Sequence, residues 1–72
     1  MDAEIKMFDV VALTEDLPEH DLRRGEVGTI VEQWDDGAYE VEFSDDMGRT
    51  YAMLALSAEQ LMPLRYRKRD AA

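Results

Sequence analysis

The stretch AYEVEFS, residues 38–44, decides the fold class of this chain. Its apolar and polar residues alternate strictly: Tyr39, Val41 and Phe43 against Glu40, Glu42 and Ser44. Successive side chains of a β-strand point to opposite faces, so a period of two predicts a strand with one apolar and one acidic face. We expect the three apolar residues to face a core and the two glutamates to face solvent.

Turn sequences flank this strand on both sides. DDG at 35–37 precedes it and DDMG at 45–48 follows it, and tight hairpin turns favour glycine because it accepts a positive φ. The adjoining segments, EVGTIVEQW at 26–34 and RTYAMLAL at 49–56, have the composition of strands. In the second of these, Ala52, Leu54 and Leu56 alternate with Tyr51, Met53 and Ala55. Two hairpins therefore join three consecutive strands.

The two ends of the chain supply the remaining strands. FDVVAL at 8–13 is a short apolar run typical of a buried strand, and LMPL at 61–64 is the last apolar segment. Just before it, SAEQ at 57–60 matches a capping box, in which Ser57 and Gln60 each cap the other's amide, and predicts one helical turn. Five short strands with one such turn before the last predict an all-β, SH3-like barrel over residues 1–64, whose closure hides the sheet edges. The basic end, RYRKRDAA at 65–72, is expected to be a flexible tail.

The segment TEDLPEHDLRRG, residues 14–25, is expected to form a long ordered loop. Pro18 favours extended geometry at Leu17, and the segment has no sustained helical stripe. We expect Leu17 and Leu22 to hold the loop against the core. Four glycines are assigned to structural turns after this loop and in the hairpins: Gly25, Gly28, Gly37 and Gly48.

Charge is the strongest feature of the composition. The chain has 17 Asp and Glu against 8 Lys and Arg, a net charge of −9. Residues 1–64 hold sixteen of the acids and four of the bases, so the predicted domain carries −12. Such a surface repels phosphate backbones, which argues against a nucleic-acid partner. The alternative interpretation is that the negative charge only keeps the protein soluble.

Several kinds of site are not expected. The chain has no cysteine, which excludes disulfides and thiolate zinc sites and fits the cytoplasm, and no apolar run approaches the length of a membrane span. His20, the one histidine, stands between Glu19 and Asp21, where we expect a solvated loop rather than a metal site or general base. The spacing of acids in DDMG does not fit a calcium loop. We therefore predict no catalytic residue, no metal and no cofactor, and classify the chain as a non-enzyme.

Three segments together resemble a known family. FDVVALTEDLPEHDLRRGEVGTIVE, YEVEFSDDMGRTYAMLAL and LMPL are similar to small bacterial proteins grouped as domain of unknown function 4926, over roughly residues 7–64. The resemblance implies an SH3-like barrel in a stand-alone protein, with some members encoded beside another small protein, and implies no activity. RRGEVGTIVE is also similar to the loop and strand of KOW modules, but two arginines do not offset the surrounding acids.

We expect a non-catalytic protein-binding or scaffolding module that uses an acidic loop surface. Trp34 is either a half-exposed anchor for a basic peptide or a lid on the barrel end. The alternatives are an accessory or regulatory subunit of a larger enzyme and, third, an RNA-binding module. The partner is expected to be a protein, and a protein encoded nearby is a candidate. We expect the chain to bind neither nucleic acid nor a membrane. The chain itself is expected to be a monomer or a weak homo-oligomer. The candidate partner-binding residues are Glu15, Asp16, Leu17, Glu19, His20, Asp21, Trp34, Asp35 and Asp36.

Overall fold

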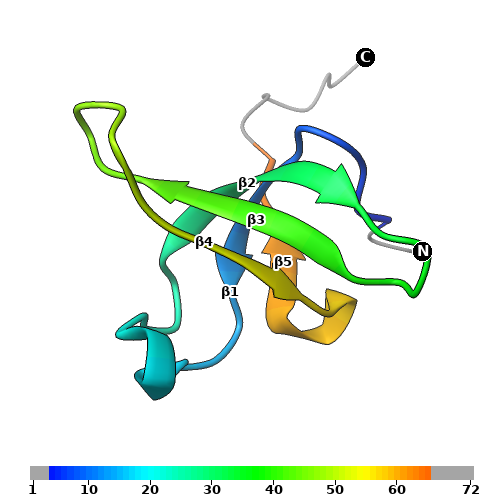
Figure 1. The fold of residues 1–72 in the computed structure, drawn as a ribbon, viewed down its shortest axis with the longest axis horizontal. Helices are drawn as coiled ribbons and strands as arrows, with labels where there is room; N and C mark the ends of the chain where they lie inside the picture. The colour runs from blue at the N-terminus through cyan, green and yellow to red at the C-terminus, as the bar shows by residue number, and fades with distance from the viewer. Residues whose placement is uncertain (1–3, 66–72) are drawn as a thin grey trace, which may run out of the picture.

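Five strands and two short 3-10 helices make up residues 4–65, the part of the chain that this computed structural model describes (Figure 1). In chain order they are β1 (Val10–Leu13), η1 (Pro18–His20), β2 (Val27–Gln33), β3 (Tyr39–Ser44), β4 (Thr50–Leu56), η2 (Ala58–Gln60) and β5 (Leu61–Pro63). Every expected strand is present, and the helical turn before the last strand is confirmed as η2. The tail predicted at 65–72 lies outside the described residues except for Arg65.

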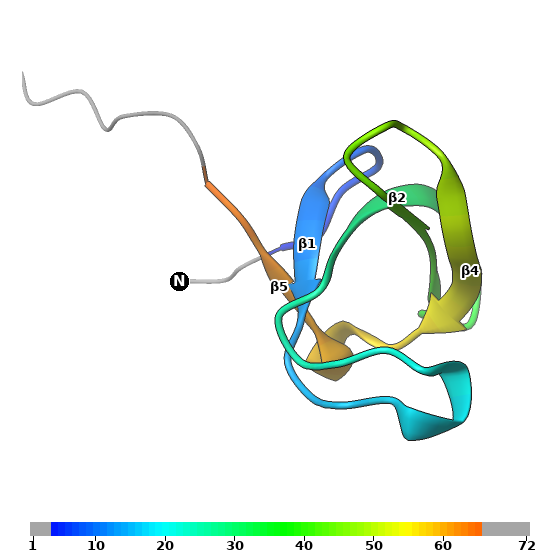
Figure 2. The same ribbon diagram turned by 90° about the vertical axis from the view of Figure 1, so that its left-hand side faces the viewer.

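The strands form one antiparallel sheet in the order β4-β3-β2-β1-β5. The prediction of a closed barrel is wrong, because β4 and β5 are the two ends of this sheet and no ladder joins them within residues 4–65. β5 is only three residues long and contains Pro63, which has no backbone N–H, so its pairing is limited to β1. The sheet nevertheless curls, and β1 and β4 lie on opposite sides of the core (Figure 2).

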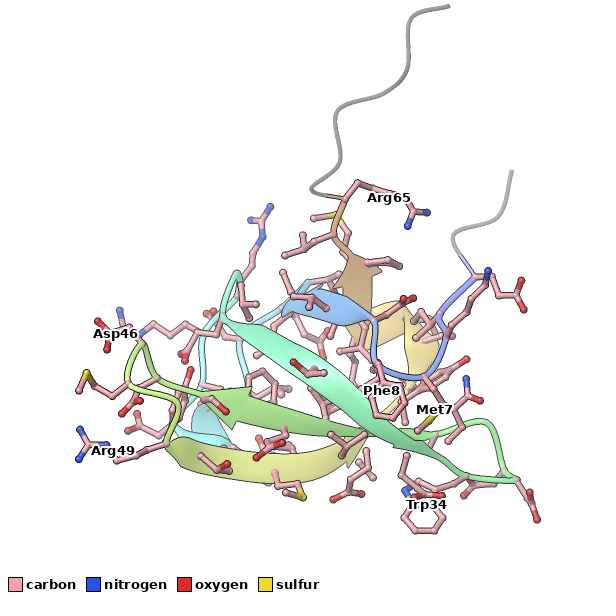
Figure 3. All side chains as sticks on the ribbon, turned by 90° about the horizontal axis from the view of Figure 1, so that it is seen from above. Met7, Phe8, Trp34, Asp46, Arg49 and Arg65 are labelled. Atoms are coloured by element: carbon pink, nitrogen blue, oxygen red, sulfur yellow. The ribbon has the colours of Figure 1, made fainter. Side chains whose placement is uncertain are left out.

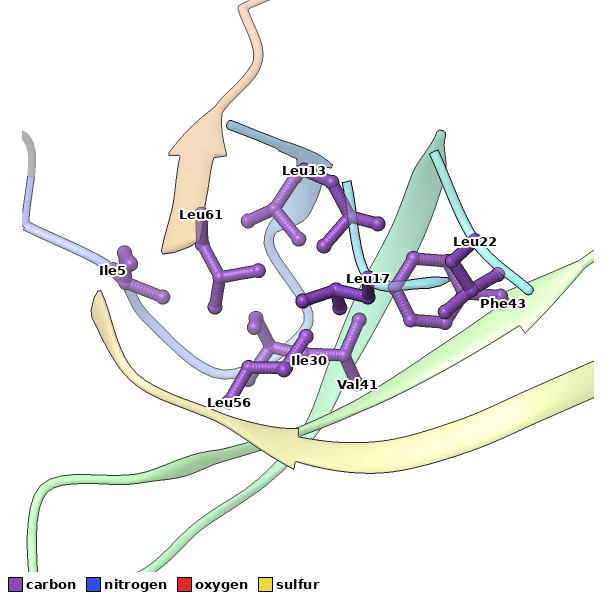
Figure 4. Close-up of a cluster of buried hydrophobic side chains, with 10 residues drawn as sticks. Ile5, Leu13, Leu17, Leu22, Ile30, Val41, Phe43, Leu56 and Leu61 are labelled. Atoms are coloured by element: carbon purple, nitrogen blue, oxygen red, sulfur yellow. The ribbon is translucent and has the colours of Figure 1, made fainter. Parts of the chain in front are cut away.

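One face of the curled sheet supplies the core. The alternation predicted for 38–44 and 49–56 is confirmed: Val41 and Phe43 are fully buried, and Ala52 and Leu54 pack against the same cluster. A strand's inward residues recur at every second position, which is why the sequence pattern located them. Figure 4 shows this cluster, which comprises Ile5, Val11, Leu13, Leu17, Leu22, Ile30, Val41, Phe43, Leu56 and Leu61.

The loop at 14–25 is held to the core as expected. Leu17 and Leu22 are both buried and form an isolated antiparallel bridge, with N–H···O distances of 2.9 and 3.2 Å. Between them η1 makes a single 3-10 turn that ends at Asp21, a residue in the left-handed conformation with φ of 57°. The bridge thus closes the loop into a small ordered unit whose two leucines belong to the core.

Of the four glycines assigned to turns, three occupy turns with positive φ, and the assignment of Gly28 is wrong. Gly28 lies inside β2, where it faces β3 at very close range. A Cβ atom there would lie 2.6 Å from Val41 Cγ1 and 3.0 Å from the carbonyl oxygen of Glu42. Glycine is therefore required at this position by packing rather than by backbone conformation.

We predict that Gly28→Ala lowers the free energy of unfolding by about 1–3 kcal/mol, the usual cost of overpacking. Because Val41 Cγ1 is the nearest obstacle, Val41→Ala should relieve part of the strain, so the double variant should lose less than the sum of the two single losses. Urea unfolding of the four proteins in this cycle measures the coupling. Additive losses would show that the two residues do not press on each other.

Candidate functional site

Two of the predicted contact acids in the loop have structural roles. The Glu15 carboxylate accepts a hydrogen bond from Gln60 Nε2 at 3.0 Å, which ties the loop to η2. Asp16 Oδ1 accepts the backbone N–H of Arg24 at 2.9 Å. Leu17, also proposed as a contact residue, is buried in the core. These three positions therefore build the loop, and their side chains are less available to a partner than the sequence suggested.

Glu19, His20 and Asp21 are exposed, as is the rest of the loop apart from Leu17 and Leu22. Glu19 and His20 belong to η1, and Asp21 caps it with its backbone N–H on Pro18 O. Beside them lies an open hollow of about 240 Å³ lined by Asp16, Pro18, Asp21, Leu22 and Arg23. Residues 4–65 bring together no group of three or more His, Cys, Asp or Glu side chains that could hold a metal ion.

The loop and Trp34, which were both proposed as partner-binding positions, do not lie together. The loop leads into β2 at Val27, whereas Trp34 follows the other end of that strand. A seven-residue strand spans roughly 20 Å, so the two sets of candidate residues lie at opposite ends of the sheet, as Figure 1 shows. The loop residues and Trp34 therefore do not form a single compact interface in this fold.

Trp34 lies against the acidic outer face of β3. Its side chain is 48% exposed, and its Nε1 donates a hydrogen bond to Glu40 Oε1 at 3.2 Å. The backbone N–H of Trp34 donates to Ala38 O at 2.8 Å and closes the hairpin turn, in which Asp35 and Asp36 are exposed. The ring is thus partly packed and partly open to solvent.

Sequence reasoning missed Met7 and Phe8, which precede β1. Phe8 was placed inside a buried strand, but the strand begins at Val10 and the Phe8 side chain is 72% exposed. The segment instead turns, because Asp9 N–H donates to Lys6 O and Asp9 Oδ2 accepts the Lys6 N–H. The interruption of the apolar run by Asp9 was the available sign of this turn.

Phe8 has an unfavourable backbone as well as an exposed ring. Its φ is +68°, in the left-handed region, which costs a non-glycine residue roughly 1–2 kcal/mol. Its N–H donates to Ile30 O at 2.9 Å, so the residue is fixed beside β2. Gln33 Nε2 donates to Ile5 O at 3.2 Å and holds the same segment near the end of β2 that precedes Trp34.

We call the exposed apolar surface formed by Met7 and the two aromatic residues Phe8 and Trp34 the aromatic end of the molecule. The three labelled side chains lie at the same end of the molecule in Figure 3, away from Asp46 and Arg49. Met7 is exposed together with Phe8 and Trp34. An exposed apolar group that also carries backbone strain is typical of a binding site, since neither feature contributes to the stability of the free protein.

The phenol of Tyr51, at the start of β4, has a raised pKa. Partial burial raises its pKa above the ordinary value for tyrosine, and the hydrogen bond from its hydroxyl to Glu26 Oε1 and repulsion from Glu26 and Asp45 raise the pKa further. The phenol therefore keeps its proton at neutral pH and acts as a hydrogen-bond donor rather than as a base.

We predict that Phe8→Gly leaves the free energy of unfolding unchanged or raises it by up to about 1 kcal/mol, because glycine removes the left-handed strain and the lost ring is mostly in solvent. Phe43→Ala provides the contrast, with an expected loss of about 3–5 kcal/mol for a fully buried ring. Urea unfolding monitored by circular dichroism measures both. A loss above 2 kcal/mol for Phe8→Gly would place the ring in the core, by the usual range for buried side chains.

Comparison with known families gives a match that spans all five strands. No curated protein and no solved structure is significantly similar to this chain. No helix within residues 4–65 has the length and apolar character needed to cross a membrane. The family model described as "Domain of unknown function (DUF4926)" matches residues 7–63, which include all five strands, the loop and the segment around Phe8. The chain therefore belongs to the family of domain of unknown function 4926.

Proposed function

We propose that this chain is a non-catalytic protein-binding module. The observation that carries the proposal is Phe8, an aromatic side chain presented to solvent on a strained backbone. Large aromatic residues are the usual anchors of protein interfaces because they bury a large apolar area when they dock. Met7 and Trp34 extend the apolar surface on the same end of the molecule.

The expected partner has a basic surface. Residues 4–65 contain fifteen Asp and Glu against five Lys and Arg, which leaves this part of the chain at −10. Charges of this density attract a basic protein from a distance and add more to the rate of association than to the strength of the final contact. Glu19 and Asp21 are suited to this steering because they are exposed and their carboxylates accept no hydrogen bond within residues 4–65.

We also infer an SH3-like architecture in an open form. What supports it is the antiparallel strand order β4-β3-β2-β1-β5, the curl of the sheet and the 3-10 turn before the last strand. In such a fold the sheet is a rigid support, and the partner contacts the loops and strand ends that it positions.

The first test compares two variants as immobilised baits in extracts of cells that express the chain. Phe8→Gly removes the proposed anchor, and Met47→Gly is the matched control because Met47 is equally exposed, at 74% against 72%, but lies in the β3–β4 turn. Proteins held by the wild type should be retained by Met47→Gly and lost from Phe8→Gly. If the wild type, Phe8→Gly and Met47→Gly captured the same proteins equally, Phe8 would not be part of the interface.

A second test measures steering by the loop. The double change Glu19→Gln and Asp21→Asn should lower the association rate constant several-fold at low salt and flatten its dependence on salt, while leaving the dissociation rate nearly unchanged. Asparagine is tolerated at the left-handed φ of Asp21, so the loop should keep its shape.

The control for this test is Glu4→Gln with Asp46→Asn, an equal change in charge at two exposed sites away from the loop. Stopped-flow or surface-binding kinetics with the captured partner gives both rate constants. If the two double variants slow association equally, the whole charge of the protein steers the partner and the loop has no special part.

A further inference from the structure

β4 is an open edge of the sheet. It occupies one end of the strand order and pairs through Tyr39–Ser44 of β3 on one side only. Within residues 4–65 no backbone hydrogen bond reaches its other side. Every second residue of an edge strand directs its N–H and C=O away from the sheet, so β4 offers a row of free donors and acceptors.

The opposite edge is protected, and β4 is not. Proteins usually protect an edge by keeping it short or by placing proline, lysine or a bulge in it. β5 is three residues long and contains Pro63. β4 has seven residues, TYAMLAL, with no proline and no charge. Its one irregularity is the register shift between Phe43 and Ser44, at the beginning of β4, so the remainder of the strand pairs regularly.

The outer face beside this edge is acidic. Glu42 is the direct partner of Met53 across the β3–β4 ladder, and Glu40 is the direct partner of Ala55. Arg49 is the only base that forms an ion pair within residues 4–65, and its partner is Asp45, in the turn before β4. Glu40 and Glu42 therefore form no ion pair within residues 4–65, although the Glu40 carboxylate accepts the Trp34 Nε1–H and the Glu42 carboxylate accepts the Thr50 hydroxyl, so a cation that approaches along β4 would meet the remaining oxygens of these two groups.

We propose that an extended segment of a basic partner protein adds to β4 as a sixth strand. This rests on the proposed protein-binding function and specifies the mode of binding. The added strand would hydrogen-bond to the free edge, as in other cases of strand addition. It would lie about two strand spacings, roughly 10 Å, from β3. Ala55 is small, so a lysine or arginine stem can cross it toward Glu40.

Charge selects this occupant over a second copy of the chain. Each copy carries a net charge of −9, so edge-to-edge pairing of two copies brings like charges together, whereas a basic segment is attracted. Because the residues of β4 are uncharged, its backbone can pair with a basic segment or with a second copy of the chain. The neighbouring acids favour the basic segment over the second copy.

The test uses the full chain and a synthetic heptapeptide of alternating lysine and valine with blocked ends, followed by amide hydrogen exchange in nuclear magnetic resonance. At a peptide concentration ten times its Kd, exchange of the alternate, outward-facing amides of β4 should slow about elevenfold. A peptide of alternating glutamate and valine has the same strand pattern with the opposite charge, and it should give no protection.

Matched variants locate the contact. Met53→Lys puts a positive charge beside the added strand and should weaken binding of the lysine peptide by about tenfold or more. Met62→Lys makes the same change on β5 at nearly the same exposure, 53% against 51%, and should bind as the wild type does. Unchanged exchange of the core amides of β2 and β3 in the free variants verifies that both are folded.

Three results would overturn the proposal. The lysine peptide could bind without slowing β4 exchange, both variants could bind alike, or β4 amides could become protected as protein concentration rises without peptide, which would identify a second copy as the occupant. None of these affects the dependence of partner capture on Phe8. If partner capture did not depend on Phe8 but the lysine peptide still slowed β4 exchange, the aromatic end would be excluded from the interface and the β4 edge would remain the proposed contact.

Discussion

A single sheet without a covering layer of helices has to bury its apolar face against itself, and this constraint governs the whole structure. Most domains solve the problem with two layers of secondary structure. Here the sheet curls until the inward residues of β1 and β4 pack into one cluster with those of β2 and β3. The inward side chains of Val41 and Phe43 fill the space beside β2, which explains the absence of a side chain at Gly28. Leu17 and Leu22 contribute to the same cluster from the loop, so the loop is part of the core and not only a connector.

The sequence predicted those features that depend on neighbouring residues. The alternation around Val41 placed β3 and its faces, the glycines at 37 and 48 placed the hairpins, and Ser57 with Gln60 placed η2, in which the Gln60 side chain accepts the Ser57 N–H at 2.9 Å. What it did not predict depends on contacts between distant segments. Closure of the barrel required β5 to pair on both sides, and a three-residue strand with Pro63 pairs only with β1.

The candidate site shows the same division. The exposure of the acids near His20 followed from local composition, but the separation of the loop from Trp34 depends on the direction of β2 in three dimensions. Phe8 was missed because an apolar residue next to a β-branched run is ordinarily part of the strand. Its exposure arises from the turn that Lys6 and Asp9 form, together with a hydrogen bond to Ile30 in a strand more than twenty residues later.

The pairing of β1 with β5 determines where the fold opens and how it forms. β2, β3 and β4 are neighbours along the chain, and short hairpins bring them together at little entropic cost. β5 joins the sheet only when the last residues of the domain meet the first, and it does so over three residues. A contact of such long sequence separation is slow to form during folding. Being so short, it is also the least protected part of the ladder against local opening, which would expose β1 as a second free edge.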